Sequence, residues 1–571
     1  MSTNTFYTKY LNNKNLTYLC LAIIICFFII NYLNIFDFKP DLNGDNVYYY
    51  ALGRALAAGK GYTDIIFFEE TPHSHFPPGY PLFNAGIMLF THSYSALKIA
   101  NGVLFGLSIL LLFFLTKKLS GNLLLALSTC LLCCMQQALL RYSTIVMSEM
   151  LFTFLTIGVL YLISLINTDH LFDKHRPRSQ IIYFILMIIG LNYIYFVRTM
   201  GTSIILAVII YFGIICIKKS ITFFKSKRTH ADLSQQIKNK QALFSHLIIL
   251  VIFIVSFAGA KTAWDMRNKS IGVTGSDYLK DFKKKPKGEI MTTFSDWTER
   301  VENNLTSYVG KWIPSAIVSD NPELEQSVTR SGIIQGICIL AIVLLGLITL
   351  KKLQLLLFLY IGITMAVLMV WPEQYGGHRY FIGIIPLFIF LFLNGCLELI
   401  NFITKKMPLA KYQQLIPAGG LILLLVFFMF PHYSKALKPQ QNFATFRQWN
   451  ERIADPAFIE YIYAIDWCKK NLPEDARIAC RKPELFYLFS GGRKSTSFPQ
   501  YAKPEELFER FKKQQISHVI IDRWFRHGYV TVYPMVKQYP DHFRPLIQVG
   551  KNTAKQLPTL VFQFFPNAEK K

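Results

Sequence analysis

LNGDNVYYYALGRALAAGKGYT, residues 42–63, lies just beyond the first long apolar run of the chain. Within it, Tyr49, Leu52 and Leu56 recur at helical spacing after Asp45 and define one apolar face. An acidic residue in the first turn of a helix is favoured by the helix macrodipole. An amphipathic helix of this kind can lie along a membrane surface, with its aromatic rings at the level of the lipid headgroups. The stretch therefore predicts an acid-bearing helix at the edge of a membrane.

The composition of the whole chain indicates an integral membrane protein. Of its 571 residues, 52% are hydrophobic, and the mean hydropathy is +0.32. Apolar runs of about 20 residues recur along most of the chain, and runs of that length can cross a bilayer as helices. The formal net charge is +25. Most of the excess Lys and Arg lies in short loops between apolar runs, which is typical of cytoplasmic loops and gives no reason to expect a nucleic acid partner.

We expect a polytopic α-helical membrane protein with about 11 transmembrane helices, the first of which is a retained signal anchor. The helices are predicted near residues 17–36, 95–116, 121–140, 145–165, 181–197, 201–217, 243–260, 332–350, 354–371, 380–400 and 413–431. If the N-terminus is cytoplasmic, the basic clusters in five connecting loops all fall on the cytoplasmic side. The first outer loop is then 37–94, and the second large outer loop is 261–331.

The chain is predicted to consist of a transmembrane domain, 1–431, and a soluble outer domain, 432–571. In the second, helical patterns such as FIEYIYAIDWCKKNL alternate with apolar strands such as SHVIIDRW, which favours a small α/β layer. Eight of the ten cysteines lie in apolar runs and are interpreted as small apolar residues. Cys468 and Cys480 belong to the soluble domain, where they could pair in an oxidising compartment.

The stretch EETPHSHFPPGYPLF, residues 69–83, completes the first outer loop. Its prolines exclude a long helix and favour a rigid, turn-rich segment. It also places two carboxylates and two imidazoles close together in the chain. These side chains could bind a divalent metal such as Zn²⁺ or Mg²⁺, although a His-x-His spacing is permissive rather than specific; they are Glu69, Glu70, His73 and His75.

Together, DNVYYYALGRALAAGKGYT (45–63) and HFPPGYPLF (75–83) resemble the first extracytoplasmic loop of the polytopic GT-C glycosyltransferases. The most similar branch is that of the protein O-mannosyltransferases and aminoarabinose transferases. Four later stretches resemble family motifs in the same order: SEMLFTF (148–154), VRTMG (197–201), WDMRN (264–268) and HRYFIGIIPLF (378–388). The resemblance implies a GT-C fold and a polyprenyl-phosphate sugar as donor. The aminoarabinose-transferase branch carries a lysine just before the proline turn; here His75 is the nearest substitute, which leaves the donor sugar open.

The chemistry of such a transfer assigns roles to the matching residues. An acceptor hydroxyl or amine attacks the anomeric carbon, so a carboxylate must take its proton, and cations or hydrogen-bond donors must hold the departing phosphate. The resemblance makes Asp45 the base and Glu149 a second acid that orients the acceptor or helps to bind a cation. The expected ligands of the donor phosphate or lipid are Arg379 first, then Arg198, His378, Tyr380, Tyr49 and His75. The arginines could instead be helix-end residues that extend towards water.

Two other functions remain open: a transporter or flippase of lipid-linked glycans, and a non-catalytic envelope assembly protein. Transporters concentrate polar residues near the midplane of the bilayer, whereas the candidates here gather at the outer ends of helices. We therefore expect an inverting glycosyltransferase, monomeric, in a bacterial-type inner membrane with its active site on the periplasmic face. Its partners would be the polyprenyl-phosphate donor, a glycan, lipid or protein acceptor, and membrane lipids. No cofactor is required for this reaction, although a divalent metal could take part.

Overall fold

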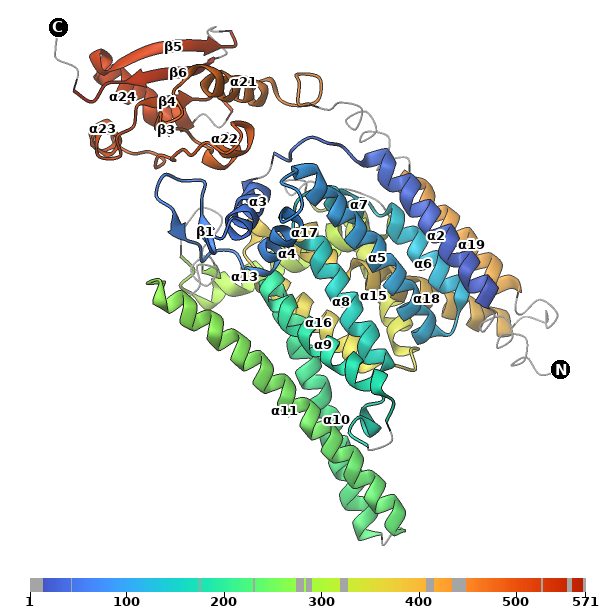
Figure 1. The fold of residues 1–571 in the computed structure, drawn as a ribbon. Helices are drawn as coiled ribbons and strands as arrows, with labels where there is room; N and C mark the ends of the chain where they lie inside the picture. Colours follow the sequence, from blue (N-terminus) through green and yellow to red (C-terminus); the bar gives the residue numbers. More distant parts are fainter. Residues whose placement is uncertain are drawn as a thin grey trace.

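The fold is a bundle of long helices with a small α/β unit at one end, which holds the C-terminus (Figure 1). The computed structural model describes residues 14–42, 44–173, 176–229, 232–273, 282–283, 290–318, 327–406, 415–433, 448–524, 527–551 and 557–567. We refer to residues 448–567 as the C-terminal unit.

Within these ranges, eight helical segments are long and apolar enough to cross a membrane. They contain the helices α2 (Lys14–Ile35), α5 (Tyr94–Ser120), α9 (Arg178–Val197), α10 (Thr202–Arg228), α11 (Leu233–Ser270), α15 (Arg330–Ile348), α18 (Ile385–Lys405) and α19 (Leu415–His432). A ninth span results if α6 (Leu123–Met135) and α7 (Gln137–Ser143), which meet at a 63° bend, are counted together. The protein is therefore an integral, multi-pass membrane protein.

The predicted number of spans is not settled by length and composition. Each of the eleven predicted runs corresponds to a helix, but α8 (Glu149–Leu165) and α16 (Gln354–Val370) have only 17 residues each. A helix of 17 residues spans about 26 Å, slightly less than the ~30 Å hydrocarbon core. The count of eleven thus stays a prediction, as does the division of the chain at residue 431.

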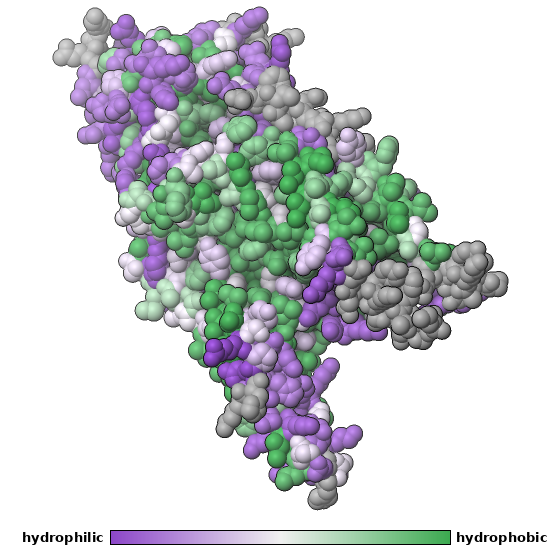
Figure 2. Space-filling view, turned by 45° about the vertical axis from the view of Figure 1, so that its right-hand side comes forward, coloured by the Kyte–Doolittle hydropathy of each residue, from purple (hydrophilic) through white to green (hydrophobic). Residues whose placement is uncertain are grey.

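The middle of the bundle is apolar, and the two ends of the molecule are hydrophilic (Figure 2). At one end lies the C-terminal unit, and at the other the hairpin of α10 and α11 extends beyond the rest of the bundle (Figures 1 and 2). With 38 residues, α11 is about 57 Å long, which exceeds the ~30 Å hydrocarbon thickness. The hairpin contains the lysine-rich stretch that follows the sixth predicted span.

The loop 37–94 forms the predicted amphipathic helix, α3 (Gly44–Ala57), then β1 (Thr63–Asp64), β2 (Thr71–Pro72) and α4 (Gly79–Met88). Unlike a helix that lies on lipid, α3 is covered on two faces. Tyr49 and Leu52 pack into the core of the bundle, while Val47, Ala51 and Ala55 pack into the core of the C-terminal unit. This double burial holds the first turn of α3 at the junction of the two parts.

The C-terminal unit is an α/β layer, as its alternating pattern predicts. Its sheet has the order β3-β4-β6-β5, with one parallel pair, β3 and β4, and two antiparallel pairs. The strands are β3 (Ile478–Ala479), β4 (His518–Ile521), β5 (Phe543–Val549) and β6 (Thr559–Phe564). The helices are α21 (Pro456–Asn471), α22 (Pro483–Phe489), α23 (Pro504–Lys513) and α24 (Tyr533–Gln538).

The two cysteines of this unit, which could have paired, are not joined. Cys468 and Cys480 are both free, buried thiols in the same apolar core. Burial raises the pKa of each thiol to about 12, so both stay protonated at neutral pH and serve as small apolar residues.

Candidate active site

Two acids and two arginines from four distant segments meet beside the first turn of α3. Arg379, in α17 (His378–Phe381), donates from Nε to Glu149 Oε1 at 2.8 Å and from Nη1 to Asp45 Oδ2 at 2.6 Å. Arg198 Nη1 lies 2.5 Å from the same Glu149 oxygen. The four residues that the motifs predicted for catalysis and phosphate binding thus form one charge cluster, although Asp45 and Arg379 are 334 positions apart.

Burial differs sharply across this cluster. The side chain of Glu149 is 1% exposed and that of Arg198 8%, whereas Arg379 is 24% and Asp45 34% exposed. A fully buried carboxylate is tolerated only when it is paired, and Glu149 is held by both arginines. Its second oxygen, Oε2, is buried without a hydrogen-bond partner among the described residues. The cluster is therefore closed at Glu149 and accessible at Asp45.

Local structure explains how each side chain reaches the cluster. Asp45 and Glu149 lie in the first turns of α3 and α8, where the helix dipole favours negative charge. Arg198 lies in extended backbone between α9 and the short helix η2 (Thr199–Gly201), so the chain reverses there. Its Nη1 also donates to Ser148 Oγ at 3.2 Å, and its guanidinium lies over the ring of Tyr380 at 5.5 Å.

The other residues predicted to contact the donor lie around this cluster in different ways. Tyr49 is 4% exposed and packs against the rings of Phe76 and Tyr80, with centroids 5.0 and 5.1 Å away; burial raises the pKa of its hydroxyl. His75 is exposed, and its ring edge contacts Phe76. The backbone of His378 begins α17, and its side chain lies outside the described residues. Their roles towards the donor stay predictions.

The four residues considered for a metal have other partners. His73 uses both ring nitrogens, because Nδ1 lies 2.8 Å from Asp64 Oδ1 and Nε2 accepts from the backbone N–H of Phe76. Glu70 pairs with Lys60 at 2.7 Å and with Lys494 at 2.8 Å, and these lysines lower the pKa of its carboxyl. Glu69 and His75 are exposed. Within the described ranges, no group of three or more His, Cys, Asp or Glu side chains could hold a metal, so Glu69, Glu70, His73 and His75 are not gathered around one point there, and a divalent metal stays a prediction.

Sequence reasoning missed the residues that hold the proline turn in place. Arg267, in the WDMRN motif, donates to the carbonyl of His73 at 2.5 Å and to that of Tyr62 at 3.2 Å. Its guanidinium also lies 5.1 Å from the ring centre of Trp264. The motif singled out this arginine without a role, and the structure gives it one: it joins α11 to the loop 37–94. Nothing in the sequence identified Asp64 as the partner of His73.

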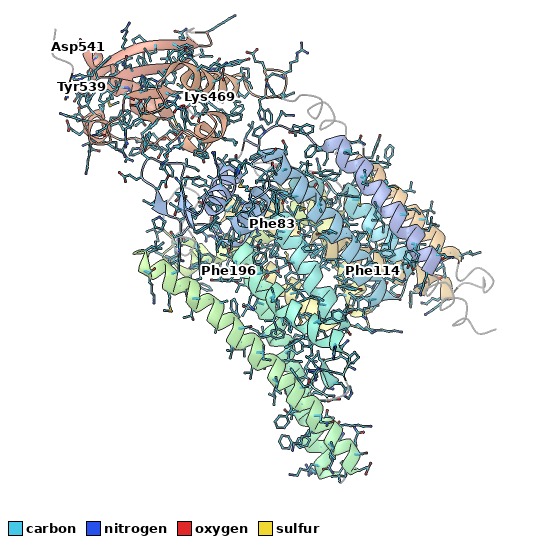
Figure 3. The ribbon with its side chains drawn as sticks, in the orientation of Figure 1. Phe83, Phe114, Phe196, Lys469, Tyr539 and Asp541 are labelled. Atoms are coloured by element: carbon cyan, nitrogen blue, oxygen red, sulfur yellow. The ribbon has the colours of Figure 1, made fainter. Side chains whose placement is uncertain are left out.

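A glycine at the turn allows α4 to contact the end of α9 closely. A Cβ on Gly79 would lie 2.7 Å from the backbone of Phe196, and Tyr193 Oη donates to the Gly79 carbonyl at 2.7 Å. Phe83 of α4 and Phe196 of α9 mark this region of the bundle in Figure 3. The contact matters for the site because Arg198 follows α9 directly.

We expect Gly79→Ala to destabilise the protein by about 1–3 kcal/mol, because the added methyl group would push α4 away from α9. Thermal unfolding of the purified protein in detergent, followed by tryptophan fluorescence, measures this as a lower midpoint. Gly86→Ala is the matched control, since that glycine is in the same helix and has nothing within 4 Å of an added Cβ. An equal drop in both variants would show that the close contact is not the cause.

Comparison with known proteins shows the fold of this chain and does not identify its activity. No protein-family model and no curated protein matches this chain. Among solved structures, ArnT from Cupriavidus metallidurans bound to undecaprenyl phosphate is similar with a TM-score of 0.54 and 10% identity, over 96% of this chain and 98% of that one. The archaeal oligosaccharyltransferase AglB from Archaeoglobus fulgidus, in complex with an inhibitory peptide and a dolichol-phosphate, has a TM-score of 0.52 and 12% identity, over 96% of this chain and 75% of that one. The predicted GT-C fold is confirmed.

Proposed function

We propose that this protein transfers a sugar from a polyprenyl-phosphate donor to an acceptor on the outer face of a bacterial-type inner membrane. The observation that supports this most directly is the cluster of Asp45, Glu149, Arg198 and Arg379, which joins one accessible carboxylate to an arginine pair. An accessible base next to fixed cations is the pair of functions that sugar transfer from a phosphate requires.

In the proposed reaction, Asp45 takes the proton of an acceptor hydroxyl or amine. The acceptor atom forms a bond to the anomeric carbon from the face opposite the phosphate, and the bond from that carbon to the phosphate oxygen breaks. The bonding electrons leave with the phosphate, so the configuration is inverted. Arg379 uses two of its five N–H donors on the acids, and the others are available to the departing phosphate.

Glu149 has a different role in this proposal. Because it is fully buried and binds both arginines, it orients them and balances their charge. The guanidinium N–H groups that are not used on the acids supply the hydrogen-bond donors that the departing phosphate needs, so the proposed reaction requires no metal. Activity that persists after treatment with a chelator would agree with this, and activity that is restored only by Zn²⁺ or Mg²⁺ would contradict it.

The similar structures support the class of donor. One contains undecaprenyl phosphate and the other a dolichol-phosphate, and both lipids are polyprenyl phosphates. An anionic headgroup on a lipid chain reaches an enzyme through the membrane, so the donor needs no nucleotide site. These similar structures do not identify the donor sugar or the class of acceptor.

Turnover of a lipid-linked sugar tests the proposal. The purified protein is incubated with a panel of polyprenyl-phosphate sugars and an extract of envelope glycans and lipids, and release of free polyprenyl phosphate is followed by mass spectrometry. We expect release with at least one donor, together with a fixed mass increase on an acceptor. Binding of the donor without cleavage would favour a transporter, flippase or assembly protein instead.

A further inference from the structure

A cavity of about 460 Å³ lies between the start of the loop 37–94, the end of α7 with its connection to α8, and the start of the C-terminal unit. We propose that it binds the acceptor, and that this acceptor is a saccharide carrying an anionic group. This inference rests on the proposed function and adds the chemical class of its second substrate. The residues that carry it are Asp41, Asn46, Arg141, Tyr142 and Trp449, which all line the cavity.

The wall on the side of the first loop is rigid and electrically balanced. Buried Lys98 lies 3.0 Å from Asp37 and 3.5 Å from Asp41, and Lys39 lies 3.6 Å from Asp37. Asp41 Oδ2 also accepts from Tyr94 Oη at 2.8 Å and from the backbone N–H of Val146 at 2.9 Å. Since each carboxylate is paired with a cation, this wall has no net charge. It can contact a ligand through its shape and its hydrogen-bonding groups.

Two polar side chains of the cavity, Asn46 and Arg141, have a hydrogen-bonding group without a partner among the described residues. Asn46 is 0% exposed; its Nδ2 donates to the Asp41 carbonyl at 3.1 Å, but its Oδ1 has no hydrogen-bond partner. A buried acceptor atom without a partner is costly, so this wall carries one polar atom whose hydrogen-bonding capacity is not used.

Arg141 is the second such group. Its side chain is exposed and lines the cavity, and among the described residues no side chain or carbonyl pairs with its guanidinium. Lys39 and Lys98, the second of which lies behind the lining, balance Asp37 and Asp41. Arg141 is therefore the one cation of the lining that these carboxylates do not neutralise. A carboxylate or a phosphate on the ligand fits the fork of its N–H groups.

Aromatic rings provide the apolar part of the site. Trp449 is fixed by a hydrogen bond from Nε1 to the Pro40 carbonyl at 2.8 Å, and Tyr142 belongs to a different wall. The C–H face of a sugar ring is apolar and can pack on such rings. A volume of about 460 Å³ also lies within the usual range for small-molecule sites, about 300–1,000 Å³.

The cavity shares its supporting segments with the charge cluster. Asn46 follows Asp45 in the first turn of α3, and Met147, another lining residue, precedes Ser148 and Glu149. A ligand in the cavity would therefore be held by the two segments that also carry the proposed base and the buried acid. This adjacency favours an acceptor over an unrelated ligand.

Binding of defined saccharides tests this site without any turnover. The purified full-length protein is titrated with three oligosaccharides of equal length, one neutral, one carrying a carboxylate and one carrying a phosphate. We expect at least one acidic probe to bind ten-fold or more tightly than the neutral probe. Arg141→Gln should abolish that preference, Trp449→Ala should weaken all binding, and the control Arg544→Gln, an exposed arginine of β5, should change neither.

Equal binding of neutral and acidic probes, or an acidic preference that survives Arg141→Gln, would overturn the proposal. Comparison of the carboxylate and phosphate probes identifies the source of the anion. If acidic binding depends on Arg141 but no polyprenyl-phosphate sugar is ever cleaved, the binding site stands and the proposed transfer fails. The two ideas can thus fail separately.

Discussion

Asp45→Asn is expected to lower turnover of a polyprenyl-phosphate sugar by about 10²–10⁴-fold, because a general base contributes a factor of that size. An amide has the shape of the carboxylate and can still accept from Arg379, so the site should keep its geometry. The side chain is also 34% exposed, and an ion pair that water reaches usually contributes only about 0–1 kcal/mol to stability. The expected result is therefore an inactive protein with a nearly normal melting temperature, measured by donor turnover and thermal unfolding on the same sample.

The control for this variant is Asp466→Asn. Asp466 is an exposed acid of α21 that pairs with Lys470 four positions later, so its loss should change neither turnover nor melting. If Asp45→Asn turned over the donor at a rate near that of the unmodified protein, the assignment of the base would be wrong. A large fall in melting temperature would instead show that Asp45 acts mainly by holding Arg379.

The residues of the candidate site could be predicted from sequence because the stretches that carry them resemble GT-C family motifs in the same order. Hydrophobic patterning placed Glu149, Arg198 and Arg379 near the ends of apolar runs and Asp45 in the amphipathic stretch that follows the first run. Which acid pairs with which arginine could not be predicted. That depends on how the helices pack against each other, and the two partners of Arg379 lie 230 and 334 positions away in the chain.

The possible metal site could not be decided from the sequence for a related reason. A His-x-His stretch with carboxylates has the same sequence pattern whether its imidazoles bind an ion or a backbone. The difference here is Asp64, which occupies one nitrogen of His73, while the backbone of Phe76 occupies the other. Both contacts arise from the fold of the turn, so residue spacing alone could not separate the two outcomes.

The burial of α3 against the C-terminal unit could not be predicted from the sequence, for another reason. The sequence predicts the burial of its hydrophobic face. Alanines on a second face do not predict burial, because such a face is also common on helices exposed to water. In the structure, those alanines pack against the C-terminal unit, Arg54 lies over the ring of Tyr487, and Lys494 pairs with Glu70. These contacts link residues more than 400 positions apart, and they make the C-terminal unit a support for the helix that carries Asp45.

Glu149→Gln should have the largest effect on stability of any change in the site, about 3–5 kcal/mol, because it removes the buried carboxylate that pairs with both Arg198 and Arg379. The intact cluster contains two acids and two arginines, so its charges cancel. Thermal unfolding in detergent should show a much lower midpoint than for Asp45→Asn. Turnover should also fall, since the arginines would no longer be held in place.

A double variant separates charge balance from loss of shape. In Glu149→Gln with Arg198→Gln, Arg379 and Asp45 remain paired and the cluster is neutral again, so much of the lost stability should return while turnover stays low. If the double variant were no more stable than Glu149→Gln, the instability would come from lost hydrogen bonds rather than from unpaired charge. If Glu149→Gln alone melted like the unmodified protein, Glu149 would not be the group that holds the arginines, and its buried position would need a direct role in substrate binding.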